Sequence, residues 1–397
     1  MGRRLQLALA GAGIGGLAMA TAMGRAGHGA TVIERAPALG EVGAGLQLSP
    51  NAMRALEFLG VAEAVQAVAS RPEAVVLRLH RSGRQVYRLA LGRAAETRWG
   101  APYLHIHRAD LLAILERAAR EAGAEIRTGI HVERAGDIRG GAALHTDAGR
   151  IEADLAIGAD GVRSVVREAL TNRGRPRYSG FVAWRGTVPA DRLPAGLLAP
   201  RATVWMGPRR HLVTYPLREG RLLNFVAIEE REAWTAEGWS APGDPDALRA
   251  SFHGWHEEVG QLFAAVDRTF QWGLFRHAPL GRWSEGRVAV TGDAAHPTLP
   301  FLAQGAALAL EDAVVLARAL QSHELTSGLT AWEAARKPRA TWLQAAAART
   351  GKRFHSRWAP EQMVKATALG LFSKLLPDRA QGINDAVYAY DPGRAPL

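Results

Sequence analysis

The stretch LQLALAGAGIGGLAMATAMGRAGHGATVIERA, residues 5–36, contains a short apolar run, a glycine-rich turn, a helix-like run and a second apolar run that ends in an acid. This order is typical of one βαβ unit of about thirty residues. Gly11 allows the sharp turn, Gly13 lets the backbone approach a pyrophosphate, and Gly16 lets the helix pack closely on the strand. Glu34 can accept hydrogen bonds from a ribose diol. The stretch therefore predicts a dinucleotide-binding site.

The same N-terminal region also has features of an export signal. Arg3 and Arg4 precede an apolar run with a small-residue Ala-Met-Ala triplet, a pattern that a signal peptidase could remove. Cleavage would remove the strand and the glycines on which the βαβ unit depends. We therefore favour the dinucleotide site, and we expect the protein to stay in the cytoplasm.

Composition narrows the class of protein. The chain has 397 residues, of which 48% are hydrophobic and 22% charged, which is typical of a globular protein with two domains or one domain with a large insertion. Cysteine is absent from the sequence, which excludes disulfides, zinc thiolate sites and cysteine nucleophiles and fits a reducing compartment. We expect no metal site. No later apolar run reaches the roughly twenty residues of a membrane-spanning helix.

The net charge of +11 raises the alternative of a nucleic-acid-binding protein. The arginines, however, are dispersed through the chain, and the densest basic tract lies near residues 336–354. We favour a basic surface that attracts an anionic cofactor or substrate, and no nucleic-acid partner.

Two later segments repeat the order of strand, glycine turn and helix. In ADLAIGADGVRSVVREAL, residues 153–170, a strand at 155–157 is followed by Asp160-Gly161 and a predicted helix from near Ser164. In GRVAVTGDAAHPTLPFLAQGAALALEDAVVLARAL, residues 286–320, a strand at 287–291 leads to Gly292-Asp293, a proline-bounded loop and a long helix from about Gly305. The carboxyl ends of parallel strands are where open α/β sheets bind ligands.

These three segments, in this order, resemble the single-component FAD monooxygenases that hydroxylate aromatic compounds, which include salicylate and 3-hydroxybenzoate hydroxylases. The first segment is similar to the family's ADP fingerprint, the second to its Asp-Gly motif and the third to its Gly-Asp motif. The resemblance implies tightly but non-covalently bound FAD, NADH or NADPH as a transient reductant, and O2 as co-substrate. It implies hydroxylation of a small phenolic or aromatic carboxylic acid through a flavin C4a-hydroperoxide.

The resemblance also assigns cofactor-binding residues. Arg108, in YLHIHRADLLAIL, would contact the FAD diphosphate, and Asp293 the ribityl chain or nearby hydroxyls. Asp160 would serve substrate or nicotinamide access, with a helix cap as the alternative. The amino end of the helix from Gly305 would stabilise the negative charge of reduced flavin, under a loop stiffened by Pro297 and Pro300. The full predicted set is Gly11, Gly13, Gly15, Gly16, Glu34, Arg35, Arg108, Asp160, Gly292, Asp293, Pro297, Gly305 and Ala306.

The fold that follows is α/β: a Rossmann-type FAD-binding domain with an inserted antiparallel β-sheet substrate domain and a C-terminal helical segment. Residues 176–275 show short alternating apolar runs and turns, typical of antiparallel strands. We expect residues 1–175 and 276–340 to form the FAD-binding domain, with a substrate-domain segment near 72–100. Residues 341–397 would form the helical segment, and the protein would be a monomer or homodimer.

One strand carries the candidate substrate residues. In GPRRHLVTYPL, alternation places His211, Val213 and Tyr215 on one face, with the first and last about 13 Å apart. By resemblance to 3-hydroxybenzoate hydroxylases, His211 would take the phenol proton as a base of near-neutral pKa, and Tyr215 would bind the carboxylate. Gln47 and Pro300 are further candidate contacts, although Pro300 stands where some of these hydroxylases have a polar residue.

One rival function on the same scaffold remains at this point. The same flavoprotein scaffold could act on an N-heteroaromatic acid, or catalyse epoxidation or natural-product tailoring. A histidine and a tyrosine hydrogen-bonded within a sheet would be the structural alternative for the substrate pair. The C-terminal segment resembles the family only loosely, because a tryptophan commonly stands there near Ala386 or Val387.

Overall fold

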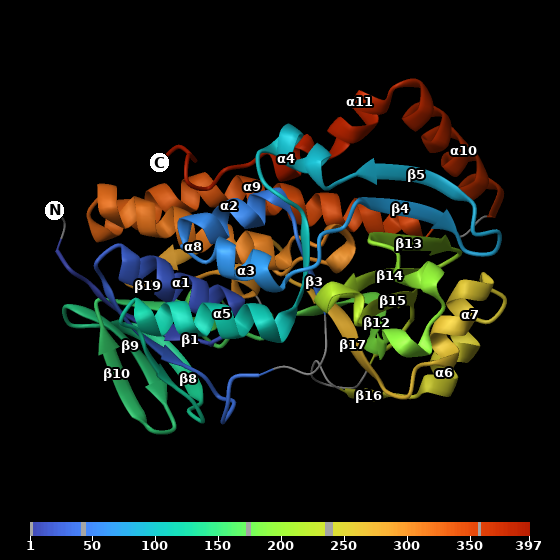
Figure 1. Ribbon diagram of the computed structural model, residues 1–397. Coiled ribbons are helices and arrows are strands. Elements are labelled where there is room, and N and C mark those ends of the chain that lie inside the picture. Colours follow the sequence, from blue (N-terminus) through green and yellow to red (C-terminus); the bar gives the residue numbers. More distant parts are fainter. Residues whose placement is uncertain (1–2, 41–44, 172–175, 235–240, 356–358) are drawn as a thin grey trace.

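The computed structural model describes residues 3–40, 45–171, 176–234, 241–355 and 359–397. A six-stranded sheet forms the base of the nucleotide-binding half (Figure 1). Its strand pairs are parallel, except that the edge strand β18 runs antiparallel to β19. The strand order is β18 (Ser284–Glu285), β19 (Val288–Val290), β11 (Leu155–Gly158), β1 (Gln6–Ala10), β2 (Gly29–Ile33) and β7 (Glu125–Arg127). The three predicted strands of the glycine motifs therefore lie side by side.

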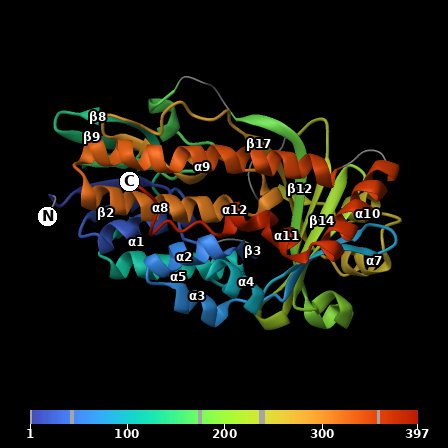
Figure 2. The ribbon, with the colours of Figure 1, turned by 90° about the horizontal axis from the view of Figure 1, so that it is seen from above.

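Helices cover this sheet and bury its apolar residues. Helix α8 is apolar around most of its circumference, which is typical of a helix buried on all sides; it packs between α1 and α9. Figure 2 shows α9 running along the length of the molecule with α8 beside it. These helices are α1 (Ile14–Arg25), α2 (Pro50–Phe58), α3 (Ala62–Val68), α5 (Arg108–Glu121), α8 (Gly305–Ser322) and α9 (Leu325–Phe354).

Two small sheets flank the nucleotide-binding half. One contains the antiparallel strands β8 (Val132–Ile138), β9 (Gly141–Thr146) and β10 (Gly149–Ala153). The other pairs β3 (Gly45–Leu48) with β6 (Leu104–His107). The β3–β6 pair matters for the site because Gly45, Leu46 and Gln47 of β3 line the cavity described below.

An eight-stranded sheet forms the second half. All neighbours are antiparallel except β13 and β4, which are parallel. The sequence prediction of an inserted antiparallel sheet is confirmed apart from this pair, and the predicted segment near 72–100 supplies two of its strands. The order is β16 (Ala241–Gly243), β17 (Thr269–Arg276), β12 (Arg177–Pro189), β15 (Leu222–Glu230), β14 (Arg210–Leu217), β13 (Arg201–Gly207), β4 (Ala74–Leu79) and β5 (Gln85–Ala90).

One face of this sheet packs against helices, and the other lines a cavity. Helices α6 (Pro245–Ser251) and α7 (Glu257–Ala264) cover one face and enclose a core that includes Trp184, Trp205 and Leu212. On β14 the neighbours of Leu212, namely His211 and Val213, point the other way and line a cavity. The predicted alternation along β14 is therefore confirmed.

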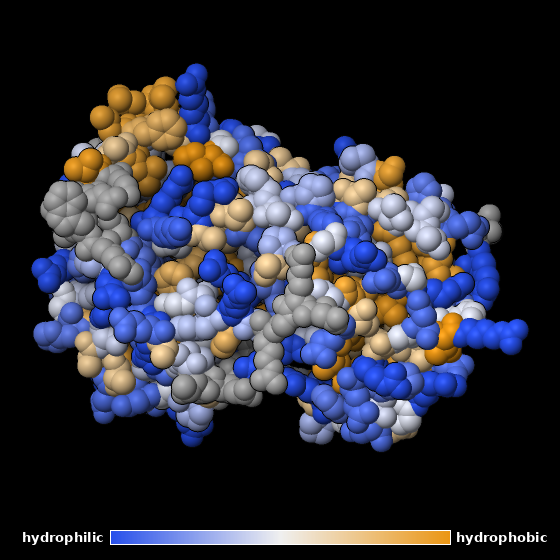
Figure 3. Space-filling view, turned by 180° about the vertical axis from the view of Figure 1, so that it is seen from behind, coloured by the Kyte–Doolittle hydropathy of each residue, from blue (hydrophilic) through white to orange (hydrophobic). Residues whose placement is uncertain are grey.

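The C-terminal segment is helical, as predicted, although its predicted start at residue 341 falls inside α9. After α9 it comprises α10 (Ala359–Leu375), α11 (Pro377–Gln381) and α12 (Asp385–Tyr388), and α4 (Arg93–Trp99) lies against α12, where Tyr388 contacts Trp99 edge to face. Figure 3 shows apolar side chains gathered at the corner formed by α10 and α11, where Leu371 and Leu375 are exposed. Among the helices in the described part of the chain, none combines the length and apolarity needed to cross a membrane.

One predicted helix is absent as such. Residues from Ser164 form a single 3₁₀ turn, Val166–Ala169, instead of an α-helix. Side chains cap the start of this turn: Ser164 Oγ accepts a hydrogen bond from Arg167 N, and Asp160 Oδ2 accepts one from Val165 N. The other 3₁₀ turns are Ala190–Arg192, Ala195–Leu198, Arg218–Gly220, Gly292–Ala294, Pro300–Leu302 and Gly382–Asn384.

Candidate active site

A cavity of about 980 Å³ joins the two halves of the molecule. It begins at the glycine turn before α1, passes the loop after β19 and ends at β14. This volume is at the upper end of the range for small-molecule sites. The residues of the three glycine motifs and the candidate substrate residues therefore line one continuous space.

The glycine turn has the close packing that its sequence predicts. Gly11 has a φ of +100°, and a Cβ there would lie 2.6 Å from Ala159 O at the end of β11. A Cβ on Gly16 would overlap Gly11 O, so Gly16 packs against the turn and does not line the cavity. A Cβ on Gly13 would meet no protein atom of the described residues within 4 Å, because this position faces the open cavity. The turn therefore exposes backbone at Gly13 and the amino end of α1 to a ligand.

Glu34 lies at the end of β2, as predicted. Its Oε2 accepts a hydrogen bond of 2.9 Å from Ala12 N in the glycine turn, and its Oε1 accepts one of 2.9 Å from Ala36 N. The side chain thus holds the turn while it lines the cavity together with Arg35. Its predicted contact with a ribose would use the remaining lone pairs of the carboxylate.

Asp160 both caps a turn and lines the cavity. Its Oδ2 caps the 3₁₀ turn through Val165 N at 2.8 Å, and the residue also lines the cavity. Its Oδ1 is buried without a hydrogen-bond partner among the described residues, and burial raises the pKa of this carboxyl. A buried acceptor without a partner is costly, so Oδ1 is suited to a donor from a bound ligand.

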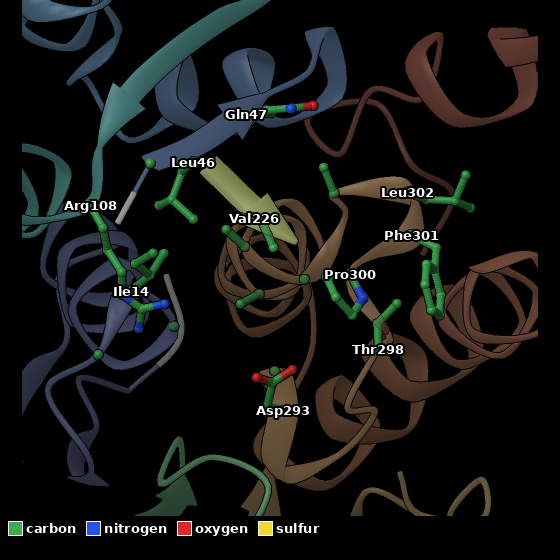
Figure 4. Close-up of a pocket in the computed structure, with 18 of the residues that line it drawn as sticks. Ile14, Leu46, Gln47, Arg108, Val226, Asp293, Thr298, Pro300, Phe301 and Leu302 are labelled. Atoms are coloured by element: carbon green, nitrogen blue, oxygen red, sulfur yellow. The ribbon is translucent and has the colours of Figure 1, made fainter. Parts of the chain in front are cut away.

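Asp293 and Arg108 both line the cavity, and Figure 4 shows them on separate elements, with Arg108 beside Ile14. Burial raises the pKa of Asp293, while the charges of His296 and Arg108 oppose that effect. The following loop lines the cavity through Thr298, Pro300, Phe301 and Leu302. Pro297, which we predicted as part of the cofactor site, is not among the lining residues; its carbonyl accepts a hydrogen bond from Gln344 Nε2 on α9 at 3.0 Å.

The remaining predicted cofactor residues also lie at the cavity. Gly15 packs toward α8, where a Cβ would lie 3.3 Å from Ala309 Cβ, and Gly292 has a φ of +57°. The α8 helix points its amino end at the cavity, and positive charge there favours an anionic ligand group. These lining residues are Gly15, Gly292, Gly305 and Ala306.

The sequence analysis did not predict a buried ionic network that joins α8, α9 and the loop after β19. Arg336 Nε on α9 lies 2.8 Å from Asp312 Oδ1, and Arg336 Nη2 lies 2.8 Å from Glu311 Oε2, with all three side chains fully buried. Asp312 Oδ2 accepts hydrogen bonds from His296 Nε2 at 2.6 Å and from Gly292 N at 3.2 Å. Burial raises the pKa of Asp312, but the charges of His296 and Arg336 outweigh it and lower the value to about 2.

Two further polar contacts brace the same region. Arg167, from the second glycine motif, donates hydrogen bonds of 2.7 Å and 3.0 Å to the carbonyls of Ala294 and Ala295 in the third. Asn51 Nδ2 donates to Gln304 Oε1 at 2.9 Å and to Glu311 Oε1 at 2.7 Å, which ties the start of α8 to α2. The signal that could have revealed the network is the pair of acids inside the apolar run LALEDAVVL.

Tyr215 and Gln47 lie at the end of the cavity near β3. The Tyr215 ring lies 4.5 Å from the His105 ring, and a Cβ on Gly45 would lie 2.5 Å from Tyr215 Cε2. Burial raises the pKa of Tyr215, so its hydroxyl stays protonated and can donate a hydrogen bond. Gln47 Oε1 is engaged by the Tyr103 hydroxyl at 2.7 Å. Apolar side chains line the space around β14: Val75, Leu77, Val204, Val213 and Val226.

His211 has a partner that we did not foresee. Its Nδ1 lies 2.6 Å from Nε2 of His355, which directly follows α9. Burial lowers the pKa of His211 well below its usual value, and the charge of a protonated His355 would lower it further. The expectation of a near-neutral pKa is therefore wrong, because it assumed a solvated imidazole. The ring is neutral, and one of its nitrogens is available as a proton acceptor.

Comparison with known proteins identifies the family to which this chain belongs. A family model described as "FAD binding domain" matches residues 4–347. A 3-amino-4-hydroxybenzoate 2-monooxygenase of Streptomyces platensis is 36% identical over 406 residues, covering 99% of this chain and 98% of that protein. The chain belongs to the FAD-dependent aromatic monooxygenases.

Further relatives are similar to this monooxygenase over most of their length. A 3-hydroxybenzoate 6-hydroxylase of Polaromonas naphthalenivorans is 33% identical and covers 98% of this chain and 97% of the relative. Klebsiella pneumoniae HpxO in complex with FAD and uric acid has a TM-score of 0.85 at 26% identity, covering 96% of this chain and 97% of that one. A salicylate hydroxylase substrate complex has a TM-score of 0.79 at 26% identity and covers 99% of each chain. The fold, the FAD cofactor and the monooxygenase activity that the sequence predicts are confirmed.

Proposed function

We propose that this monooxygenase hydroxylates a small phenolic aromatic carboxylic acid of the 3-hydroxybenzoate or salicylate type. The observation that carries the proposal is the single cavity, because the three FAD motifs and the β14 residues His211 and Tyr215 line the same space. The named substrates of the relatives, 3-amino-4-hydroxybenzoate and 3-hydroxybenzoate, share a ring, a hydroxyl and a carboxylate. An apolar slot with polar groups at its ends suits such a molecule.

We infer that FAD lies between the glycine turn and the amino end of α8. Gly13 and the start of α1 would hold the diphosphate with Arg108, Glu34 the ribose, and Asp293 the hydroxyls near the phosphate. When bound, FAD supplies the activation of O2 after reduction by NADH or NADPH. The open backbone at Gly13 and the buried Asp160 Oδ1 fit a large polar ligand with donors and acceptors. Pro297 lies outside the cavity lining, so its part would be limited to stiffening the loop.

The chain's own residues prepare the substrate ring. His211 is neutral at rest because it is buried. It takes the proton of the phenol as the phenolate forms, because the negative charge of the phenolate beside it stabilises the protonated imidazole; the phenolate is the more nucleophilic form of the ring. The protonated hydroxyl of Tyr215 donates a hydrogen bond to the carboxylate at the other end of the slot. The apolar walls exclude water from the reacting atoms.

Replacement of His211 tests this assignment. We expect His211→Ala to slow product formation from 3-hydroxybenzoate by about 10²-fold to 10⁴-fold, the usual contribution of a general base, while the protein keeps its flavin absorbance. Product would be quantified by chromatography alongside NADH oxidation and peroxide. His323→Ala, at an exposed histidine after α8, is the control. Coupled turnover equal to that of the parent would leave His211 as a structural residue of the sheet.

Replacement of Tyr215 tests the carboxylate contact. We expect Tyr215→Phe to raise the KM for 3-hydroxybenzoate about 10-fold, because a hydrogen bond to a charged group contributes about 1.5 kcal/mol. The KM for a phenol without a carboxylate should not change. Tyr178→Phe, whose hydroxyl bonds to Arg231 O instead, is the matched control. An equal rise in KM for both substrates would contradict a carboxylate contact.

A second substrate class has a specific observation in its favour. A 6-hydroxynicotinate 3-monooxygenase of Pseudomonas fluorescens is 34% identical over 352 residues, covering 87% of this chain and 90% of that protein. Flavin-containing protein assayed with 6-hydroxynicotinate, salicylate and 3-hydroxybenzoate decides between the classes. Stimulated NADH oxidation with product from the nicotinate alone would transfer the proposal to N-heteroaromatic acids.

We propose a cytoplasmic location and a monomeric or homodimeric state. The absence of cysteine from the sequence supports the location, since such a chain needs no oxidising compartment for its folding. The exposed apolar side chains of Leu371 and Leu375 in α10 and of Leu376 directly after it (Figure 3) would suit the homodimer.

A further inference from the structure

Two buried histidines from distant parts of the chain meet at the cavity wall. His211 is on β14 and His355 directly follows α9; the two residues are 1% and 3% exposed, and Nδ1 of the first lies 2.6 Å from Nε2 of the second. Phe301 and Phe354 pack against the His211 ring, and Phe181 lies edge to face against the His355 ring. These rings exclude water from the pair, so the hydrogen bond between the two imidazoles is made inside the protein.

Only one hydrogen can lie between Nδ1 of His211 and Nε2 of His355, so one imidazole donates the hydrogen bond and the other accepts it. Burial lowers the pKa of both imidazoles, that of His355 to about 3, so both rings are neutral at rest. A neutral imidazole has one N–H donor and one acceptor. The hydrogen bond therefore has two possible directions: His211 Nδ1–H donates to His355 Nε2, or the reverse. Only the first direction leaves His211 Nε2 without a proton and able to accept one from a ligand in the cavity.

A carboxylate on the far side of His355 selects the first direction. His355 Nδ1 is buried without a hydrogen-bond partner among the described residues and lies 4.0 Å from Glu230 Oε1 at the end of β15. In the first direction Nδ1 carries a hydrogen toward this carboxylate, whereas in the second it presents a lone pair to a negative charge. Electrostatic attraction favours the N–H. Glu230 therefore fixes the tautomer of His355, and His355 fixes that of His211.

Charged side chains lie between the histidine pair and the surface of the protein. Glu230 is also paired with Arg209 Nε at 3.1 Å, and the Arg209 side chain is 51% exposed. Arg210 lowers the pKa of His355 by its positive charge, and Arg353 lines the cavity on the same side. A proton on His355 is thus repelled by Arg210 and attracted by Glu230, which borders solvent. The order from the cavity outward is His211, His355, Glu230.

We propose that His355 is a positioning residue that makes His211 a proton acceptor and passes the substrate proton on toward Glu230. The phenol O–H proton moves to His211 Nε2 as the His211 Nδ1 proton moves to His355 Nε2, and the His355 Nδ1 proton leaves toward Glu230 and solvent. One proton enters the relay and one leaves, and no electrons are transferred. This inference rests on the proposed function of His211, and it assigns to the end of α9 a part in the chemistry.

Proton release on ligand binding tests the relay without turnover. Oxidised holoenzyme would be mixed with 3-hydroxybenzoate in weakly buffered solution with a pH indicator, while ultraviolet absorbance follows the bound phenolate. We expect His355→Gln to slow proton release and phenolate formation at least about 10-fold, a modest part of what a general base contributes. Glutamine can accept the His211 hydrogen bond but cannot transfer a proton. Flavin content and the dissociation constant of the ligand should stay within about twofold of the parent.

Two further variants keep the test decisive. Glu230→Gln should slow proton release in the same direction, whereas Glu285→Gln, which removes a carboxylate from a surface ion pair with Arg282 on the other sheet, should not. In His355→Ala, added imidazole should restore the rate, which a purely structural role would not allow. Parent-like release in His355→Gln and Glu230→Gln would overturn the relay. If His211→Ala also releases the proton at the parent rate, the proposed role of His211 fails as well, so the two failures are distinguishable.

Discussion

Gly13→Val is expected to yield a folded protein that does not retain FAD. The added side chain would meet no protein atom, because a Cβ at this position has nothing within 4 Å among the described residues. It would instead occupy the space in front of the amino end of α1, where we place the diphosphate. The purified variant should therefore be colourless, with a circular dichroism spectrum like that of the parent stripped of flavin.

The control for this prediction is a second glycine with open space. Gly260→Val, in α7 on the far face of the large sheet, also adds a Cβ that meets nothing within 4 Å. It should retain flavin absorbance at the parent's ratio to protein. Normal FAD content in Gly13→Val would show that the diphosphate lies elsewhere in the cavity, and loss of fold in both variants would mean that valine itself is not tolerated.

Arg336→Met is expected to cause the largest loss of stability. It removes the cation between two fully buried carboxylates, Glu311 and Asp312, and leaving a buried charge without its partner costs about 3–5 kcal/mol. Part of the loss will be offset because Asp312 still accepts a hydrogen bond from His296 and Glu311 still pairs with Arg339. Urea unfolding of the holoenzyme, followed by circular dichroism, measures the change in the free energy of unfolding.

The neighbouring residue provides the control. Lys337→Met also removes a cation from α9, but its partner Glu333 is one turn away and the Lys337 side chain is 31% exposed. A pair of this kind contributes about 0–1 kcal/mol. Equal destabilisation by the two substitutions would show that the buried network contributes no more than a surface pair.

Local motifs explain why the nucleotide-binding half was predictable. Gly11, Gly13 and Glu34 act within one βαβ unit, and the helix that begins at Gly305 follows β19 after the loop of residues 291–304, so short sequence windows contain the whole pattern. The alternation of β14 was predictable for the same reason, because successive side chains of a strand point to opposite faces. The prediction of a helix after Ser164 was wrong because the sequence indicated where a helical turn begins but not that it ends after the single 3₁₀ turn Val166–Ala169.

Partners far apart in the sequence were not predictable. His211 and His355 are separated by 144 residues, and Arg167 and Ala294 by 127. The acids Glu311 and Asp312 in an apolar helix indicate buried charge, but their spacing does not say which arginine neutralises them. Burial lowers the pKa of His211, and this burial arises from tertiary packing, which includes the contacts of Phe301 and Phe354 with its ring.

The continuous cavity has a thermodynamic consequence. Since cofactor and substrate residues line one space without an intervening wall, FAD would itself form part of the surface that contacts the aromatic ring. The free energy of binding one ligand then depends on the presence of the other, and this coupling is reciprocal. The substrate would hold FAD in place as much as FAD completes the chamber for the substrate, so the enzyme at work would lose its cofactor more slowly than the enzyme at rest.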